Sequence, residues 1–283
     1  MSQFSIHTNM GAQVALESLS STATALAATQ KQISTGYRVA DATDDGAAYA
    51  VAQRVRSDVG ALTSANQQLG NAQGLLSTTV SALNNMSNTM TSMRDVLVKL
   101  ADGSVTGNER TQYIAQYQSF VQNIKSDIQD ATYNGKTLIG NIAGSSGSTG
   151  SVNVVRNEVG TNYTIASAGA SAMYHSMIFT STQLGAAASV AAFLTATGVF
   201  VKQINAVGTS LNTYGADTTY VNNQITYNSD KIDALNAGIG SLIDANMAQE
   251  SAQLQALQIQ QQLGTQALSI ANQAPQTLLS LFK

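Results

Sequence analysis

The last part of the chain is a long helical segment without charge. Between Ser251 and Phe282 no residue is Asp, Glu, Lys or Arg, while leucine, isoleucine and alanine recur at helical spacing among nine glutamines. Steps of three and four place the apolar residues on two nearly opposite sides of a helix of about 3.6 residues per turn. The first seam contains Met247, Leu254, Leu257, Leu268, Ala271, Leu278 and Phe282, with Glu250, Gln261, Gly264 and Pro275 at its weaker positions. The second contains Ala252, Ala256, Ile259, Leu263, Ala267, Ile270 and Ala274. A helix that is apolar on two sides must lie between other helices, so we expect this segment to form an interface.

A membrane-spanning helix is the usual alternative for an uncharged segment of this length. A bilayer core requires about 20 predominantly apolar residues. Here glutamines at positions 253, 255, 258, 260, 261 and 262 would place six amides in hydrocarbon. We therefore expect no membrane insertion.

Composition favours thin helical packing and excludes several classes of function. Tyr and Phe together number 16, Trp and Cys are absent, and only one Pro occurs. Without cysteine, neither a disulfide framework nor thiolate chemistry is possible. A formal charge of -3 provides no basic field, so we expect no nucleic-acid partner. Glu17 is the only charge before Lys31, which excludes a cleavable secretory signal and leaves either a cytoplasmic protein or export by another route.

The N-terminal segment repeats the pattern of the C-terminal one. Its apolar seam consists of Ala12, Leu16, Leu19, Ala23, Leu26 and Ile33. We expect the two ends of the chain to pack on each other. Residues 34–38 interrupt the period, and Thr43, Asp44 and Asp45 then provide capping side chains for a new helix.

The middle of the chain contains two further helices and a region without helical period. A seven-residue apolar repeat from Val55 to Leu97, interrupted by Asn66 and Gln73, predicts a helix of nearly fifty residues. A shorter helix follows from Tyr113 to Ile128. Between 133 and about 189 we expect a flexible glycine-serine loop at 144–150 and a β-hairpin with strands 152–155 and 163–165. The helical repeat returns near residue 190 and is expected to continue into the C-terminal helix, through Leu194, Val201, Ile204, Leu211, Ile225, Ile232, Leu235 and Ile239.

These elements predict a mainly α protein, a long antiparallel helical coiled coil or bundle formed by both chain ends with a small hairpin-containing middle region.

No residue pattern indicates catalysis or a cofactor. Asp44 and Asp45 are the only adjacent carboxylates, and their place before the longest helix favours capping over metal binding or acid-base chemistry. His7 and His175 are isolated, with no HExxH or other ligand cluster. Phosphate loops, dinucleotide fingerprints and nucleophile elbows are also missing. We expect no cofactor, no metal site and no enzymatic activity.

Both ends of the sequence carry motifs that are typical of one known family. Residues 32–48 (QISTGYRVADATDDGAA) resemble the flagellin pattern of a Ser/Thr-Gly-x-Arg-Ile turn leading into Asp-Asp-x-Ala. Residues 261–276 (QQLGTQALSIANQAPQ) resemble the flagellin tail, especially of the alphaproteobacterial kind, and Asn134-Gly135-Lys136 matches the turn that ends its second core helix. The chain departs from the pattern at Ala40, where relatives usually carry Asn, and at residues 46–49.

The resemblance covers roughly residues 1–140 and 190–283 and implies a non-catalytic filament subunit for swimming motility. Such a subunit is exported unfolded through the flagellar secretion channel and is extracellular, and its terminal helices become ordered on polymerisation. The resemblance implies an inner terminal-helix domain from residues 1–42 with 240–283 and a helical rod domain from 43–140 with 190–239. Residues 141–189 are then a short variable region. Implied partners are further copies of itself, an export chaperone, and the hook-associated junction and cap proteins. The self-assembly packing residues are then Leu16, Leu19, Leu26, Ile33, Leu254, Leu257, Ile259, Leu263, Leu268, Ile270, Leu278 and Phe282.

Two rival functions remain at this point. A hook-filament junction protein is built from the same ends but adds one ring and stops. A flagellin with an enzymatic insert would need catalytic residues between 141 and 189, where Glu158 is the only acidic residue and His175 the only histidine.

Overall fold

The structure is a computed structural model that describes residues 9–140, 142–145 and 147–280, with side chains described as far as residue 273. Contacts within the chain divide it into two compact units. We call Met1–Ser57 with Ala234–Lys283 the terminal unit, and Asp58–Asp233 the central unit. The boundaries between the two units, at Ser57 and Ala234, lie inside long helices. They differ from the boundaries of the three expected domains, and the three-domain division stays a prediction.

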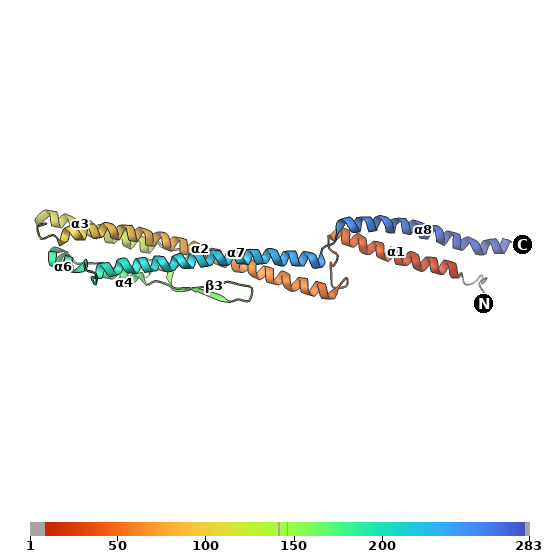
Figure 1. The fold of residues 1–283 in the computed structure, drawn as a ribbon, viewed down its shortest axis with the longest axis horizontal. Coiled ribbons are helices and arrows are strands. Elements are labelled where there is room, and N and C mark those ends of the chain that lie inside the picture. Colours follow the sequence, from red (N-terminus) through yellow and green to blue (C-terminus); the bar gives the residue numbers. More distant parts are fainter. Residues whose placement is uncertain (1–8, 141, 146, 281–283) are drawn as a thin grey trace. The chain divides into compact units, whose positions relative to one another are not determined.

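The described residues form eight helices and four short strands (Figure 1). The long helices are α1 (Met10–Thr35), α2 (Gly46–Ala101), α3 (Gly107–Asp130), α7 (Val199–Ile243) and α8 (Met247–Ser280). The short helices are α4 (Ala170–Ser176), α5 (Ser181–Gly185) and α6 (Ala187–Phe193). The strands are β1 (Lys136–Thr137), β2 (Ser148–Thr149), β3 (Val152–Val155) and β4 (Asn162–Ile165). The predicted mainly helical fold with a small central hairpin is confirmed.

The core of the central unit lies between α2, α3 and α7, which run side by side in Figure 1. The seven-residue repeat of α2 is buried throughout this unit, at Leu62, Leu69, Leu76, Leu83, Met90 and Leu97. Helix α3 adds Tyr117, Val121, Ile124 and Ile128 to this core. Most of the apolar burial in the described chain is therefore in the central unit.

Helix α7 faces this core with a seam that the sequence analysis did not predict. Its buried residues are Phe200, Val207, Tyr214 and Val221, again at intervals of seven. The repeat read from the sequence, from Val201 through Ile204 and Leu211 to Ile225, lies half-buried on either side of them. The rings of Phe200 and Tyr214 determine which side of α7 is buried, because they fill more of the core than the aliphatic side chains next to them.

The two polar interruptions of the α2 repeat form amide contacts with α7. Gln73 Nε2 donates to Asn222 Oδ1 at 2.7 Å, and the Nδ2 of the fully buried Asn228 donates to Asn66 Oδ1 at 2.9 Å. A buried amide that loses its partner costs about 1–3 kcal/mol. The pair of Asn66 with the buried Asn228 therefore favours one register of α2 against α7, while the Gln73–Asn222 pair is exposed.

The hairpin of β3 and β4 is antiparallel, with Val152 opposite Ile165 and Val155 opposite Asn162. It is attached to α7 through polar contacts. The Tyr163 hydroxyl donates to Asp217 Oδ1 at 2.6 Å, and Lys231 Nζ donates to Glu158 Oε1 at 2.5 Å. The predicted hairpin is confirmed, with strand bounds within one residue of those expected.

The rest of the middle region is more structured than its sequence indicates. The expected flexible loop at 144–150 contains β2, which pairs in parallel with β1, and a Cβ on Gly147 would approach the Thr137 side chain to 3.0 Å. The helices α4, α5 and α6 follow the hairpin where no helical period was found. They are too short for a repeat, and their order comes from burial of side chains such as Leu184 and Val190.

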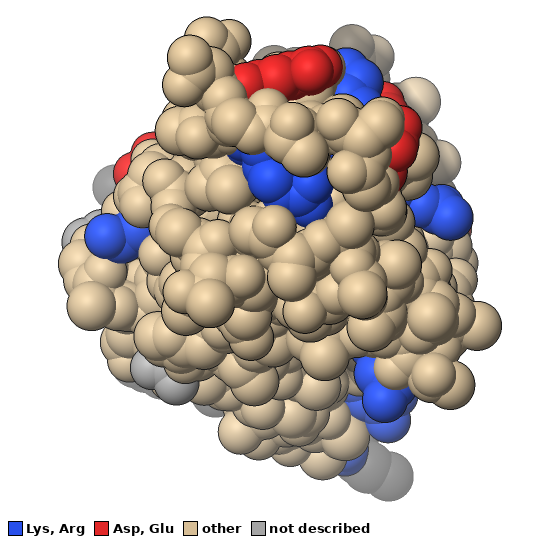
Figure 2. Space-filling model, turned by 90° about the vertical axis from the view of Figure 1, so that its left-hand side faces the viewer, with Lys and Arg blue, Asp and Glu red and all other residues tan. Residues whose placement is uncertain are grey.

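Charged side chains are sparse on the face seen in Figure 2. Most of that surface is neither acidic nor basic, in agreement with a sequence in which only 10% of residues are charged. None of the described helices combines the length and hydropathy needed to cross a membrane.

Candidate assembly interface

Helices α1 and α8 form an antiparallel pair in the terminal unit (Figure 1). At one end, Asn9 caps α1 through its Oδ1 and donates from its Nδ2 to the Ala271 carbonyl at 2.7 Å. At the other end, Ala245 N donates to the Gly36 carbonyl at 2.9 Å. Between them a Cβ on Gly264 would lie 3.2 Å from Leu19 Cδ1, so glycine permits the close approach of the two helices. The two chain ends therefore pair along the length of α1, as the sequence predicts.

Helix α8 presents its first seam to α1. Leu257 is only 8% exposed, and Leu254, Gln261, Gly264, Leu268 and Ala271 are half-buried. Met247 at the start of the helix is exposed. The backbone of Leu278 belongs to α8, but its side chain and the whole of Phe282 lie outside the described residues.

The second seam of α8 is uncovered in the single chain. Ile259 is 57% exposed, Leu263 58% and Ile270 67%, and Ala252, Ala256 and Ala267 on the same side are also exposed. No residue between Ser251 and Phe282 is charged. Soluble monomers rarely expose a long apolar surface of this kind unless it binds a partner.

Helix α1 contributes a narrower seam than its sequence indicates. Leu19, Leu26 and Ile33 lie on the side toward α8, but Leu16 is exposed and does not belong to that side. The small residues Ala15 and Thr22 take the places that the apolar pattern gave to Leu16 and Ala23. The pattern favoured the larger side chains, whereas the close approach to α8 favours the smaller ones.

The turn after α1 joins it to the end of α7. Gly36 ends α1 in the left-handed conformation, with φ of 75°, and donates to the Gln32 carbonyl. Arg38 N and Val39 N both donate to the Ile243 carbonyl, at 2.7 and 3.2 Å, and the Arg38 guanidinium donates to the Leu242 carbonyl. A cation at a helix C-terminus is electrostatically favourable. The turn is thus held by the last carbonyls of α7.

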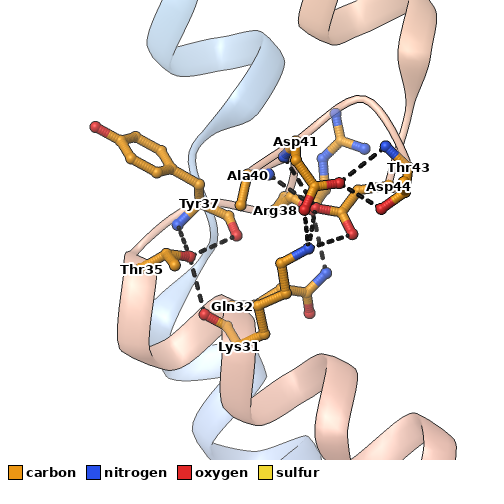
Figure 3. A network of polar contacts seen from close by, with 9 residues as sticks. All are labelled: Lys31, Gln32, Thr35, Tyr37, Arg38, Ala40, Asp41, Thr43 and Asp44. Carbon is orange, nitrogen blue, oxygen red and sulfur yellow. Dashed lines mark hydrogen bonds and ion pairs between the residues drawn. The ribbon is translucent and has the colours of Figure 1, made fainter.

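An ion cluster fixes the conformation of the same turn (Figure 3). Lys31 Nζ donates to Asp41 Oδ2 at 2.7 Å and to both carboxylate oxygens of Asp44 at 2.9 Å. We call these three residues the Lys31 cluster. The hydrogen bond from the Lys31 ammonium is the main reason that the pKa values of Asp41 and Asp44 are lowered, and those carboxylates raise the pKa of Lys31. Sequence analysis missed Lys31 and Asp41, although the first cation after thirty nearly uncharged residues was a usable signal.

The three predicted capping residues have separate roles in the structure. Asp45 Oδ1 accepts from Ala47 N and Ala48 N, both at 3.0 Å, which is the arrangement of a helix N-cap on α2. Asp44 instead accepts from the turn amides of Ala40 and Asp41 within the Lys31 cluster. Thr43 bonds to Asp41 through its amide and its hydroxyl. Asp44 and Thr43 therefore hold the turn before α2 and do not cap that helix, since the basic side chain of Lys31 attracts both aspartates of its cluster.

Helix α8 begins separately from α7, against the expectation of one continuous helix. Asn246 Oδ1 accepts from Ala248 N at 3.2 Å and from Gln249 N at 3.4 Å. This local cap competes with continuation of the helix, because asparagine offers the backbone an alternative hydrogen bond. The break allows α8 to pair with α1 independently of α7.

Comparison with known proteins identifies the family. The family model described as bacterial flagellin N-terminal helical region matches residues 6–143, and the one described as bacterial flagellin C-terminal helical region matches residues 194–282. A flagellin of Brucella melitensis biotype 1 is 33% identical over 295 residues, covering 99% of each chain. Flagellin FljK of Caulobacter vibrioides is 30% identical over 279 residues, covering 99% of this chain and 98% of the relative.

A solved structure shows the same fold at lower sequence identity. A putative flagellar hook-associated protein from Vibrio parahaemolyticus superposes with a TM-score of 0.55 at 17% identity, covering 71% of this chain and all of the other. At that identity the likeness concerns the fold alone. The full-length sequence relatives are flagellins, so this chain belongs to the bacterial flagellin family.

Proposed function

We propose that this protein is the subunit of a flagellar filament and polymerises through its terminal unit. The observation that carries the proposal is the uncovered seam of α8, where Ile259, Leu263 and Ile270 remain exposed after α1 has covered the opposite side. A further copy is a suitable partner, because a surface on one copy that binds a different surface on the next generates an open helical polymer. Family membership supports the same conclusion.

The proposed role is structural, and the proposed partners include the junction and cap proteins and an export chaperone. The flagellins are a family of structural proteins, and among the described residues no group of three or more His, Asp or Glu side chains is placed to hold a metal. We infer that the subunit is exported to the cell exterior and incorporated in the filament between the junction and cap proteins. An export chaperone would cover the apolar α8 seam before assembly.

The test is seeded polymerisation of the purified full chain, followed by sedimentation and electron microscopy. The wild type should form filaments without a length limit. Leu263→Glu should reduce sedimented protein to background, because every copy would bury an unpaired carboxylate in a repeated contact. Gln262→Glu is the matched control, with the same charge one residue away on the exposed glutamine side, and should polymerise.

Two results would contradict the proposal. Filaments of Leu263→Glu that match the wild type would show that the α8 seam is not an interface. A wild type that adds one ring to filament ends and stops would instead identify a junction protein.

A further inference from the structure

The β3–β4 hairpin is attached to the rest of the central unit in two different ways. Its base, the two strands themselves, is held by apolar burial, with Val154 only 5% exposed and Ile165 fully buried. Its tip, residues 156–161, is joined to α7 by hydrogen bonds such as that from Lys231 to Glu158, a pair whose side chains stay 33% and 19% exposed. Partly exposed ion pairs contribute less to stability than apolar burial does. The tip is therefore held less strongly than the base.

The polar contacts of the tip are also incomplete. Arg156 Nη1 donates to the Tyr220 hydroxyl at 3.1 Å, but the buried Arg156 Nε and Glu158 Oε2 have no hydrogen-bond partner among the described residues. Val159 at the turn points away from the core and is 80% exposed. Buried polar atoms without partners destabilise the segment that carries them, and segments with few apolar contacts open locally before the rest of a protein. The closed tip is thus a state of low local stability.

One side chain connects the tip to the packing of α2 against α7. Asn228 of α7 is fully buried, and the two hydrogens of its Nδ2 go to two different elements. One is donated to the Arg156 carbonyl in the tip at 3.0 Å, and the other to Asn66 Oδ1 on α2 at 2.9 Å. Asn228 Oδ1 accepts from Gln224 Nε2 at 2.9 Å, which orients the amide. Both donors are satisfied only when the tip is closed and α2 is in register.

We propose that the hairpin tip is a flap that opens from α7 while the base stays packed, and that Asn228 couples its closure to the register of α2 against α7. In the closed state the Arg156 carbonyl holds the Asn228 amide in the orientation that also meets Asn66. In the open state the amide loses that restraint, and its bond to Asn66 is weakened. Because such coupling is reciprocal, loss of the Asn66 contact also favours the open flap. The inference concerns the single chain and goes beyond the proposed function, since it does not require polymerisation.

Native-state hydrogen exchange of the full-length monomer tests the flap. Once released, the tip cannot keep its own hydrogen bonds, because an isolated pair of strands is marginally stable at best. The Arg156 amide, which donates to the Thr161 carbonyl at 2.9 Å, should therefore exchange at least about tenfold faster than the amides of the strands. Equal exchange of tip and strands would overturn the flap.

The contribution of the ion pair is tested in the same experiment. Lys231→Met should accelerate exchange of the tip about two- to fivefold and leave the strands unchanged. High salt should have the same effect on the wild type and none on Lys231→Met. Lys202→Met, at an exposed position of the same helix, is the matched control and should not change exchange of the tip. An unchanged tip in Lys231→Met would show that the polar contacts do not hold the flap.

The coupling is tested by two amide side chains of α2 that differ in their connection to the tip. Asn66 reaches it through Asn228, whereas Gln73 pairs with Asn222, which has no hydrogen bond to the tip residues. Asn66→Ala should accelerate exchange of the tip about threefold or more, measured relative to core amides, and Gln73→Ala less than about 1.5-fold. In an Asn228→Leu background, Asn66→Ala should have no further effect on the tip.

Two results would overturn the coupling. Equal acceleration by Asn66→Ala and Gln73→Ala would show a general loosening of the α2–α7 pair, and an unchanged tip in Asn66→Ala would show that Asn228 transmits nothing. All these measurements are made on the monomer, whereas the proposed function is tested by seeded polymerisation. A failure of one is therefore distinguishable from a failure of the other.

Discussion

Leu257 and Ile259 of α8 have similar size but lie on opposite sides of the helix. Substituting each one therefore distinguishes contacts within the chain from contacts between copies. Leu257 is 8% exposed and faces α1, whereas Ile259 is 57% exposed and faces away from it. Truncating each to alanine removes a similar volume from opposite sides of the same helix. Leu257→Ala should therefore affect the single chain, and Ile259→Ala should affect the polymer.

The expected magnitudes follow from these exposures. A buried leucine truncated to alanine costs about 2–5 kcal/mol, so Leu257→Ala should reduce amide protection of the helix pair by about 30-fold or more. Complete burial of isoleucine contributes about 1.5–3 kcal/mol. Since 57% of the Ile259 surface remains to be covered, its loss should cost about 1–2 kcal/mol per subunit, or about 5- to 30-fold in critical concentration.

Hydrogen exchange of the monomer and sedimentation of seeded polymers measure the two effects separately. Ile259→Ala should change monomer protection by less than about 0.5 kcal/mol, as surface substitutions do. Wild-type critical concentration in Ile259→Ala would refute the reasoning, because the uncovered seam would then contribute nothing to assembly. Equal monomer effects of both substitutions would show that α8 is covered on both sides within one chain.

Three further predictions concern the turn after α1, the β3–β4 hairpin with β2, and the connection between α2 and α3. The pKa values of Asp41 and Asp44 are lower in the folded turn than in the unfolded chain, so the ionised carboxylates stabilise the turn when the pH is above their unfolded pKa. This stabilisation should be lost as the pH falls below about 4. Asp41→Asn should flatten that acid dependence in thermal melts followed by circular dichroism. A ten-residue insertion after Val159, which is 80% exposed at the hairpin turn, should leave secretion and motility intact. The same insertion between Ser148 and Thr149 should lower thermal stability because it interrupts β2. Arg110 donates to carbonyls of the α2–α3 turn and to that of Leu184, so Arg110→Ala should lower the melting temperature by several degrees, and an unchanged melt would show that water replaces it.

The parts of the fold that follow a long repeat were predictable from sequence. The α2 repeat from Leu62 to Leu97 is buried as expected, because a heptad sustained over many turns allows only one side to face a partner. The two-sided character of α8 was also visible, since it depends only on the angular spacing of apolar residues. The hairpin was found because two short β-branched runs flank a turn.

The remaining parts depend on contacts that a periodic pattern does not contain. The short helices α4 to α6 have fewer than eight residues each and are ordered by packing on the central core. The Lys31 cluster joins residues ten and thirteen positions apart through a turn, where no helical spacing applies. Leu16 lies outside the side of α1 that faces α8, because apolar size alone does not show which side admits the close approach at Gly264, and its predicted role in self-assembly stays a prediction.

Charge in the terminal unit is concentrated near the ends of its helices. Along α1 and α8 the described charged residues are Glu17, Lys31 and Glu250, of which Lys31 lies near the end of α1 and Glu250 in the first turn of α8. The apolar seams between those positions therefore meet few ions, and repeating them in every copy buries little charge. In the turn after α1, Lys31, Asp41 and Asp44 are bonded to one another. A polymer that uses the α8 seam thus gains affinity from its apolar length, while the Lys31 cluster keeps the turn in one conformation.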